Sequence, residues 1–131
     1  TDYAEGGWSV EDSVVFARAL RERGCDFIDV SGGGLVPYQK IVVGPGYQVP
    51  YARRIRHDAD VPTIAVGMIE DPVAANNFIE AGDCDLVALA RGMLRNPRWV
   101  WSAADALDAE AVDAPNQYAR ARPPRAKAAS R

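Results

Sequence analysis

The sequence is poor in residues that form disulfides or bind metals. Its 131 residues include two cysteines, Cys25 and Cys84, and one histidine, His57. The cysteines do not form a CxxC pair, so the sequence excludes a disulfide-stabilised miniprotein and we expect no metal site. Each cysteine lies just before an aspartate at the expected start of a buried strand. We therefore expect two small buried side chains in a reducing, cytoplasmic protein.

Long hydrophobic runs are also missing. No apolar stretch approaches the roughly 18 residues of a transmembrane helix, and no basic segment precedes an apolar one as in a signal peptide. We expect no membrane insertion. Apolar residues make up 48% of the chain and charged residues 25%, a balance that excludes disordered and collagen-like chains and is typical of one globular domain. The chain begins at Thr1 rather than at methionine, and we expect it to be a piece of a longer protein.

Positive charge is scarce in most of the chain. Residues 1–118 carry a net charge of −8, whereas residues 119–131 carry +5 and no acidic residue. Nucleic-acid-binding domains usually cluster basic residues on a folded face, so we expect no nucleic-acid partner. The Pro- and Ala-rich composition of residues 121–131 predicts a disordered basic tail.

The chain alternates between helical and strand patterns, and several boundaries carry local signals. Ser9 and Asp12 have the spacing of a capping box, and Asp71 and Asn96, each followed by proline, are expected helix caps. The runs at 63–66 and 86–89 are continuously apolar, which is typical of parallel strands covered on both faces. The expected helices are 11–23, 48–59, 72–81 and 97–107, and the expected strands are 27–31, 63–66 and 86–89.

This alternation predicts an α/β fold with a parallel sheet and right-handed crossovers. A closed (β/α)8 barrel needs eight strands and about 250 residues, so three strands form either part of a barrel or a small open sheet.

In such folds ligands bind beyond the carboxyl ends of the strands. Three strand ends are candidates, and they begin at Ser31, Gly67 and Ala90. Glycine after a strand allows the backbone to approach a ligand closely, and Arg91 offers a planar guanidinium to phosphate oxygens. Glycine runs can also be simple flexible turns. Arg91 could instead form a structural salt bridge with Asp85 or Asp71. His57 belongs to a solvated helix face, and we expect no catalytic role for it.

Four motifs in this order resemble the Old Yellow Enzyme family, and most closely its short, thermophilic-like branch. The motifs are Pro45-Gly46-Tyr47-Gln48-Val49, Ala65-Val66-Gly67-Met68-Ile69, Ala90-Arg91-Gly92-Met93-Leu94-Arg95-Asn96-Pro97 and Gln117-Tyr118-Ala119-Arg120. The resemblance covers residues 1–120. It implies an FMN-dependent (β/α)8 barrel of which this chain is the C-terminal portion, with strands six, seven and eight.

The resemblance also implies a reaction. The family passes hydride from NADPH or NADH to FMN, and then to the activated C=C bond of an alkene such as an enone. Gly67, Met68, Ala90 and Arg91 would bind the FMN phosphate end, and Ser31 is a further cofactor-binding candidate. The family's catalytic residues would lie in the part that is not present, so we expect none in this chain.

Arg120 matches the arginine finger that reaches a neighbouring subunit in that branch, which implies a homodimer or tetramer. Two alternatives stay open. The chain could be part of another phosphate-binding barrel enzyme. It could also be a non-catalytic half-barrel that pairs through its open strand edges.

Overall fold

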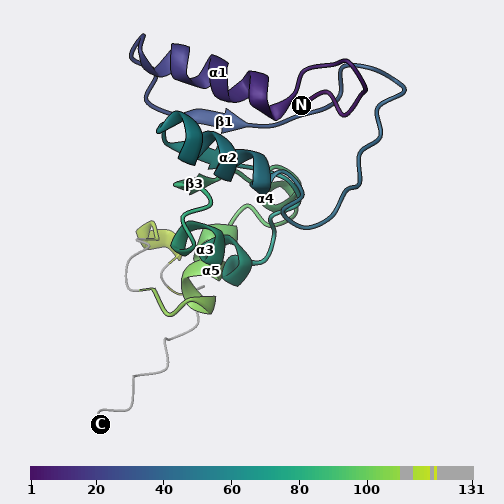
Figure 1. Cartoon of the computed structure of the whole chain (residues 1–131). Coiled ribbons are helices and arrows are strands. Elements are labelled where there is room, and N and C mark those ends of the chain that lie inside the picture. Colours follow the sequence, from purple (N-terminus) through teal and green to yellow (C-terminus); the bar gives the residue numbers. More distant parts are fainter. Residues whose placement is uncertain (110–113, 119, 121–131) are drawn as a thin grey trace.

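A computed structural model of the protein describes residues 1–109, 114–118 and 120 (Figure 1). The expected tail at 121–131 lies outside the described residues. The elements are α1 (Val10–Arg21), β1 (Ile28–Val30), α2 (Val49–Ala59), β2 (Thr63–Ala65), α3 (Pro72–Glu80), β3 (Leu86–Val87), α4 (Arg91–Arg95), α5 (Trp99–Ala106) and the 3-10 turn η1 (Asn116–Tyr118).

The three strands form one parallel sheet in the order β1-β2-β3, as the alternation predicts. Ile28 pairs with Thr63, and Ile64 pairs with Leu86. Because parallel neighbours end at the same edge of the sheet, the loops that follow β2 and β3 emerge side by side. The α/β prediction is confirmed, with α1 and α2 at one end of the molecule and α3 and α5 at the other (Figure 1).

Local capping explains where two of the helices begin. Ser9 and Asp12 form the predicted capping box, in which the Asp12 amide donates to Ser9 Oγ and Asp12 accepts from the Ser9 amide. Asp71 accepts from the amide of Ala74 at 3.0 Å and caps α3, also as predicted. The cap predicted at Asn96 is wrong, because its side chain accepts from the Arg98 amide in a turn and α5 begins only at Trp99.

The core lies between the sheet and the helices packed on it, chiefly α1 and α2, with Ala75 contributed by α3. Its members are small or branched apolar side chains, so the layers approach closely. They are Val14, Ala17, Val30, Val49, Ala52, Ile55, Ala59, Val61, Ala65, Ile69, Ala75 and Cys84.

Two burial predictions are wrong. The 86–89 run is not a buried strand, because β3 pairs only through Leu86 and Val87 and Leu86 is 46% exposed. Cys84 is buried as expected, but Cys25 is partly exposed at the turn that follows α1. Leu86 lies in β3, which is an edge strand of the sheet, and Cys25 lies in the turn before β1, outside the sheet.

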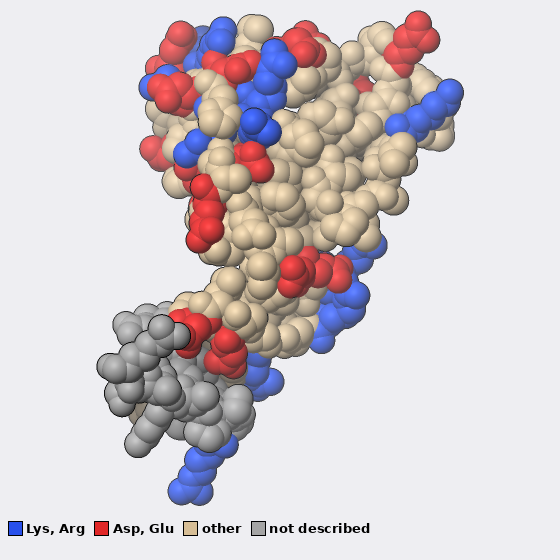
Figure 2. All heavy atoms as spheres, turned by 60° about the horizontal axis from the view of Figure 1, so that its bottom comes forward, with Lys and Arg blue, Asp and Glu red and all other residues tan. Residues whose placement is uncertain are grey.

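Charged side chains of both signs mingle on the surface (Figure 2). Several form ion pairs on α1 and α2, such as Arg21 with Asp60 at 2.6 Å and Arg54 with Asp58. No helix in the described part of the chain is long and apolar enough to cross a membrane.

Candidate functional site

A hollow of about 120 Å³ opens where the loops after β2 and β3 meet. We call it the β2–β3 pocket; it is lined by residues 47–48, 66–70 and 88–92. Four of the five residues predicted to bind a cofactor line it. They are Gly67, Met68, Ala90 and Arg91. The structure therefore brings together side chains and backbone that are more than twenty positions apart in the sequence.

The first wall of the pocket is a turn with an uncommon backbone. Gly67 has φ +128° and Met68 has φ +52°, so two successive residues adopt positive φ. A non-glycine residue pays a conformational cost for this geometry, and such residues cluster at functional sites. Gly46 donates to the Gly67 carbonyl at 2.8 Å and holds the turn. In the described part of the chain, the amides of Gly67 and Met68 have no acceptor, so both can serve a ligand.

The second wall begins at Ala90, the residue before α4. Its amide also has no acceptor among the described residues. Arg91 is exposed, and its guanidinium forms no ion pair or hydrogen bond with any residue that the structure describes. An unpaired cation beside unpaired amides is a suitable arrangement for a phosphate or another oxyanion.

The alternative of a salt bridge from Arg91 to Asp85 or Asp71 is wrong. Asp85 is bound by Arg56, at 2.9 Å from Nε and 3.1 Å from Nη2, and it also accepts from the Thr63 amide. The hydrogen bond from Arg56 is the main reason that the pKa of Asp85 lies below its ordinary value. Asp71 is occupied as the cap of α3.

The sequence reasoning missed Glu70 and Arg95. Glu70 lines the pocket, and its carboxylate pairs with Arg95 of α4. The Glu70 carbonyl accepts from Trp99 Nε1 at 2.7 Å, which ties the loop to α5. The spacing of Arg91 and Arg95 was the available signal, because residues four apart lie on one face of a helix.

Tyr47 and Gln48 also line the pocket and were not predicted as site residues. Gln48 is 3% exposed, and the available signal was the first of the four family motifs, which contains both residues. A Cβ on Gly67 would lie 3.1 Å from the Tyr47 ring, so glycine allows the close contact there.

Ser31 does not line the β2–β3 pocket. It lies beyond β1 and lines a separate hollow of about 220 Å³ with Thr1 and Tyr51. The glycine run after it is not a free loop. Gly32 donates to Gln48 Oε1 at 2.6 Å, and Gly33 donates to the Thr1 carbonyl at 2.9 Å.

Arg120 is exposed, and its predicted role concerns a second subunit. The segment before it docks on α5, where the Arg98 guanidinium lies 4.6 Å from the Tyr118 ring and 5.4 Å from the Trp101 ring. His57 is exposed, as expected for a solvated face. Among the described residues, no three His, Cys, Asp or Glu side chains are grouped to hold a metal.

Residues 1–110 match the family described as NADH:flavin oxidoreductase / NADH oxidase. The chain belongs to this family. The resemblance seen in the four motifs is thereby confirmed at the level of the family. Membership implies a TIM-barrel fold, and the described residues contribute a three-stranded parallel sheet to it.

Similar proteins include several bacterial NADPH dehydrogenases. The chain is 44% identical to the NADPH dehydrogenase of Geobacillus thermodenitrificans, 46% to that of Geobacillus sp. strain WCH70 and 42% to that of Bacillus subtilis, over 120 residues each. Each match covers 92% of this chain but 35% of the relative. The chain thus spans about a third of the length of these relatives.

Proposed function

We propose that this chain is the C-terminal part of an FMN-dependent NAD(P)H oxidoreductase and supplies its FMN phosphate site. In this proposal residues 1–120 belong to the barrel, and β1, β2 and β3 are its sixth, seventh and eighth strands. The observation that carries it is the convergence of Gly67, Met68, Ala90 and Arg91 on one pocket. The family match removes the alternative of an unrelated phosphate-binding barrel.

The residues present fit a phosphate group. Three backbone amides, of Gly67, Met68 and Ala90, have no acceptor in the described structure, and the Arg91 side chain has no partner there. Amide donors bind a phosphate oxygen without adding a flexible side chain, and a guanidinium adds charge and a second donor. Positive φ at Gly67 and Met68 turns successive peptide units at this wall, which suits the close approach of an anion.

Bound FMN would supply hydride transfer from NADPH or NADH to the C=C bond of an activated alkene. This chain's part in that reaction is to bind and orient the cofactor through its phosphate end, and it contributes no catalytic residue. Arg120 would act in the substrate pocket of a neighbouring subunit, within a homodimer or tetramer. A cytoplasmic location belongs to the same proposal.

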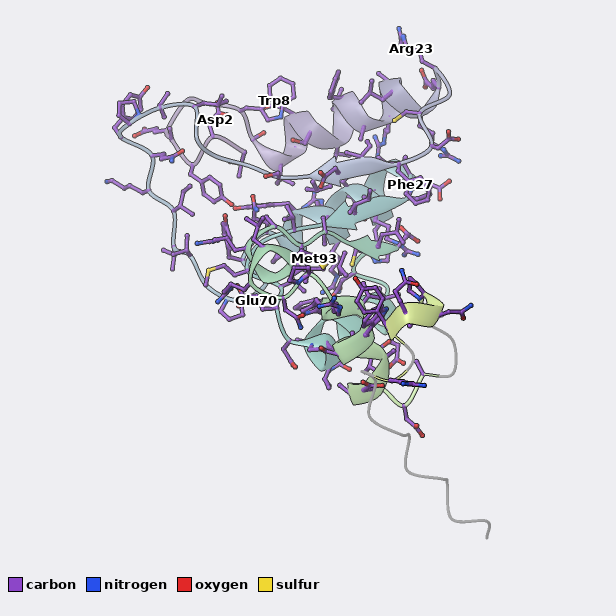
Figure 3. The ribbon with its side chains drawn as sticks, turned by 180° about the vertical axis from the view of Figure 1, so that it is seen from behind. Asp2, Trp8, Arg23, Phe27, Glu70 and Met93 are labelled. Atoms are coloured by element: carbon purple, nitrogen blue, oxygen red, sulfur yellow. The ribbon has the colours of Figure 1, made fainter. Side chains whose placement is uncertain are left out.

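The test is flavin retention by the purified chain. After incubation with excess FMN and desalting, we expect a visible flavin band near stoichiometry, reduced at least about tenfold by Arg91→Ala because a charge-assisted phosphate contact is lost. Arg23→Ala is the matched control, since Arg23 is an exposed arginine far from Glu70 and the pocket (Figure 3). Equal retention by Arg91→Ala and the wild-type chain would contradict the proposed phosphate site, whereas a colourless wild-type chain would mean that the site forms only together with strands that this chain does not contain.

A second candidate function is a half-barrel that pairs with another half. It is favoured by the outer edges of β1 and β3, which pair with no further strand in the described residues, and by exposed Phe16, Phe27 and Leu86. Unpaired edges promote association. Sedimentation velocity separates the two ideas: a compact oligomer that retains no FMN would favour pairing over cofactor binding.

A further inference from the structure

The β2–β3 pocket contains a group that opposes its proposed ligand. Glu70 lines the pocket together with Arg91. A carboxylate at the wall of an anion site repels the anion, and it also competes for the nearest cation. A pocket with Glu70 and Arg91 alone would therefore carry no net positive charge for a phosphate.

Arg95 changes this balance. Its guanidinium pairs with the Glu70 carboxylate, and its Nε donates to the Arg91 carbonyl at 3.3 Å. Arg95 lies one turn after Arg91 on α4, so the helix places both arginines toward the same loop. Figure 3 shows Glu70 beside α4, the helix that also carries Met93. The Glu70 charge is thus neutralised by Arg95, and Arg91 has no ion-pair partner in the part of the chain that the structure describes.

We propose that Arg95 is a positioning residue that neutralises Glu70, so that Arg91 stays available to the ligand's phosphate. This inference rests on the proposed function, in which the pocket holds the phosphate end of FMN. In this inference, the Glu70–Arg95 pair is the reason that the pocket prefers a phosphorylated flavin to an unphosphorylated one. Arg95 itself need not touch the phosphate.

Two roles for Arg95 predict different results: neutralising the charge of Glu70, and bracing the two walls of the pocket. Arg95 also bridges the two walls, since it contacts the loop after β2 and the first turn of α4. If bracing were its role, removing Glu70 would do the same damage as removing Arg95. If neutralisation is its role, removing the Glu70 charge restores what the loss of Arg95 destroys.

The experiment compares the wild-type chain with Arg95→Met, Glu70→Gln and the double variant. Titrations of FMN and of riboflavin, followed by flavin fluorescence at low salt, give the dissociation constants. We expect Arg95→Met to weaken FMN binding about three- to tenfold, the size of one uncompensated charge near a dianion at a water-like dielectric. Riboflavin binding should be unchanged, because riboflavin has no phosphate. The effect on FMN should shrink with added salt.

Glu70→Gln should bind FMN at least as tightly as the wild-type chain, because it leaves Arg95 as a further positive charge beside the pocket, and the double variant should match the wild-type chain within about twofold, because it removes both charges of the pair. Thermal melts check folding, which the pair should hardly affect because its side chains are 64% and 41% exposed.

Three results would overturn the inference while leaving the proposed function intact. They are unchanged FMN binding by Arg95→Met, an equal loss of riboflavin binding, and a double variant as weak as Arg95→Met. If the wild-type chain binds no FMN, this chain does not form the proposed phosphate site by itself, and the inference fails for this chain.

Discussion

Gln48 Oε1 accepts a hydrogen bond of 2.6 Å from the backbone amide of Gly32. This contact joins the residue before α2 to the loop after β1. Gln48 also borders the turn after β2, where a Cβ on Gly67 would lie 3.3 Å from Gln48 Cγ. One buried amide side chain thus links two neighbouring strand ends, including the wall of the β2–β3 pocket.

Replacing Gln48 with leucine should destabilise the protein by about 1–3 kcal/mol, because the Gly32 amide loses its acceptor in a part-buried place. Urea denaturation followed by circular dichroism measures the change. Gln117→Leu is the control: Gln117 is exposed, and its replacement should change stability by less than about 0.5 kcal/mol. Equal midpoints for the Gln48 variant and the wild-type chain would show that the bond contributes nothing.

Gly67→Ala should destabilise the protein by roughly 1–3 kcal/mol and weaken flavin retention. An alanine there would have to hold φ near +128°, with its Cβ 3.1 Å from the Tyr47 ring. Gly44→Ala is the matched control, since nothing lies within 4 Å of a Cβ at that position and its φ is not positive. Thermal melts and FMN desalting provide the two readouts, and similar behaviour of both variants would refute the role of the turn.

The pair of Arg56 and Asp85 should make stability depend on acid pH. Arg56 lowers the pKa of Asp85 below its ordinary value of 3.8, so the folded state favours the carboxylate. The resulting contribution to the free energy of unfolding is fully present at pH values above the ordinary pKa. It is lost as the pH falls through the lower pKa of the folded state.

Arg56→Met should therefore cost about 1–3 kcal/mol at neutral pH and flatten the acid limb of the stability curve. Arg53→Met serves for comparison, because Arg53 is 66% exposed and lies 3.5 Å from Asp83. Urea denaturation at a series of pH values between about 2 and 7, which span the range in which carboxyl groups titrate, tests this expectation. An unaltered acid limb in Arg56→Met would rule out the linkage.

The two cysteines should differ in reactivity. Cys84 is 1% exposed, and burial raises the pKa of its thiol, which leaves less of the nucleophilic thiolate at neutral pH. Cys25 is partly exposed. Brief iodoacetamide treatment of the native protein should therefore label Cys25 well before Cys84, as read by peptide mass spectrometry. In urea both should react, and equal labelling without urea would contradict the burial of Cys84.

The order and type of the main elements follow from the sequence alone. Each predicted helix and strand boundary lies within about two residues of the observed one, as short-range signals allow. Ser9 and Asp71 cap their helices through bonds to residues only three positions away. Such contacts form wherever the local backbone is helical, so no tertiary information is needed to infer them.

The set of residues that line the site depends on both the sequence and the tertiary structure. The sequence places Gly67 and Arg91 after predicted strands. Because parallel strands end at one edge of the sheet, these positions predicted a shared ligand site. Ser31 has the same position relative to its strand, yet it faces a different hollow. The sequence pattern specifies which strand end a residue follows, but not which neighbour it meets there.

Tertiary structure alone decided the partners. Asp85 pairs with Arg56 and Glu70 pairs with Arg95, and the two members of each pair lie 25 or more positions apart in the sequence. The exposure of Leu86 depends on which other segments cover the margin of the sheet. Hydrophobic periodicity cannot report these contacts, because it records the preference of a residue for burial and not the identity of its neighbour. The sequence by itself determined an α/β order with ligand-facing strand ends. Only the folded chain, by pairing Asp85 with Arg56 and Glu70 with Arg95, left Arg91 without a partner among the residues that the structure describes.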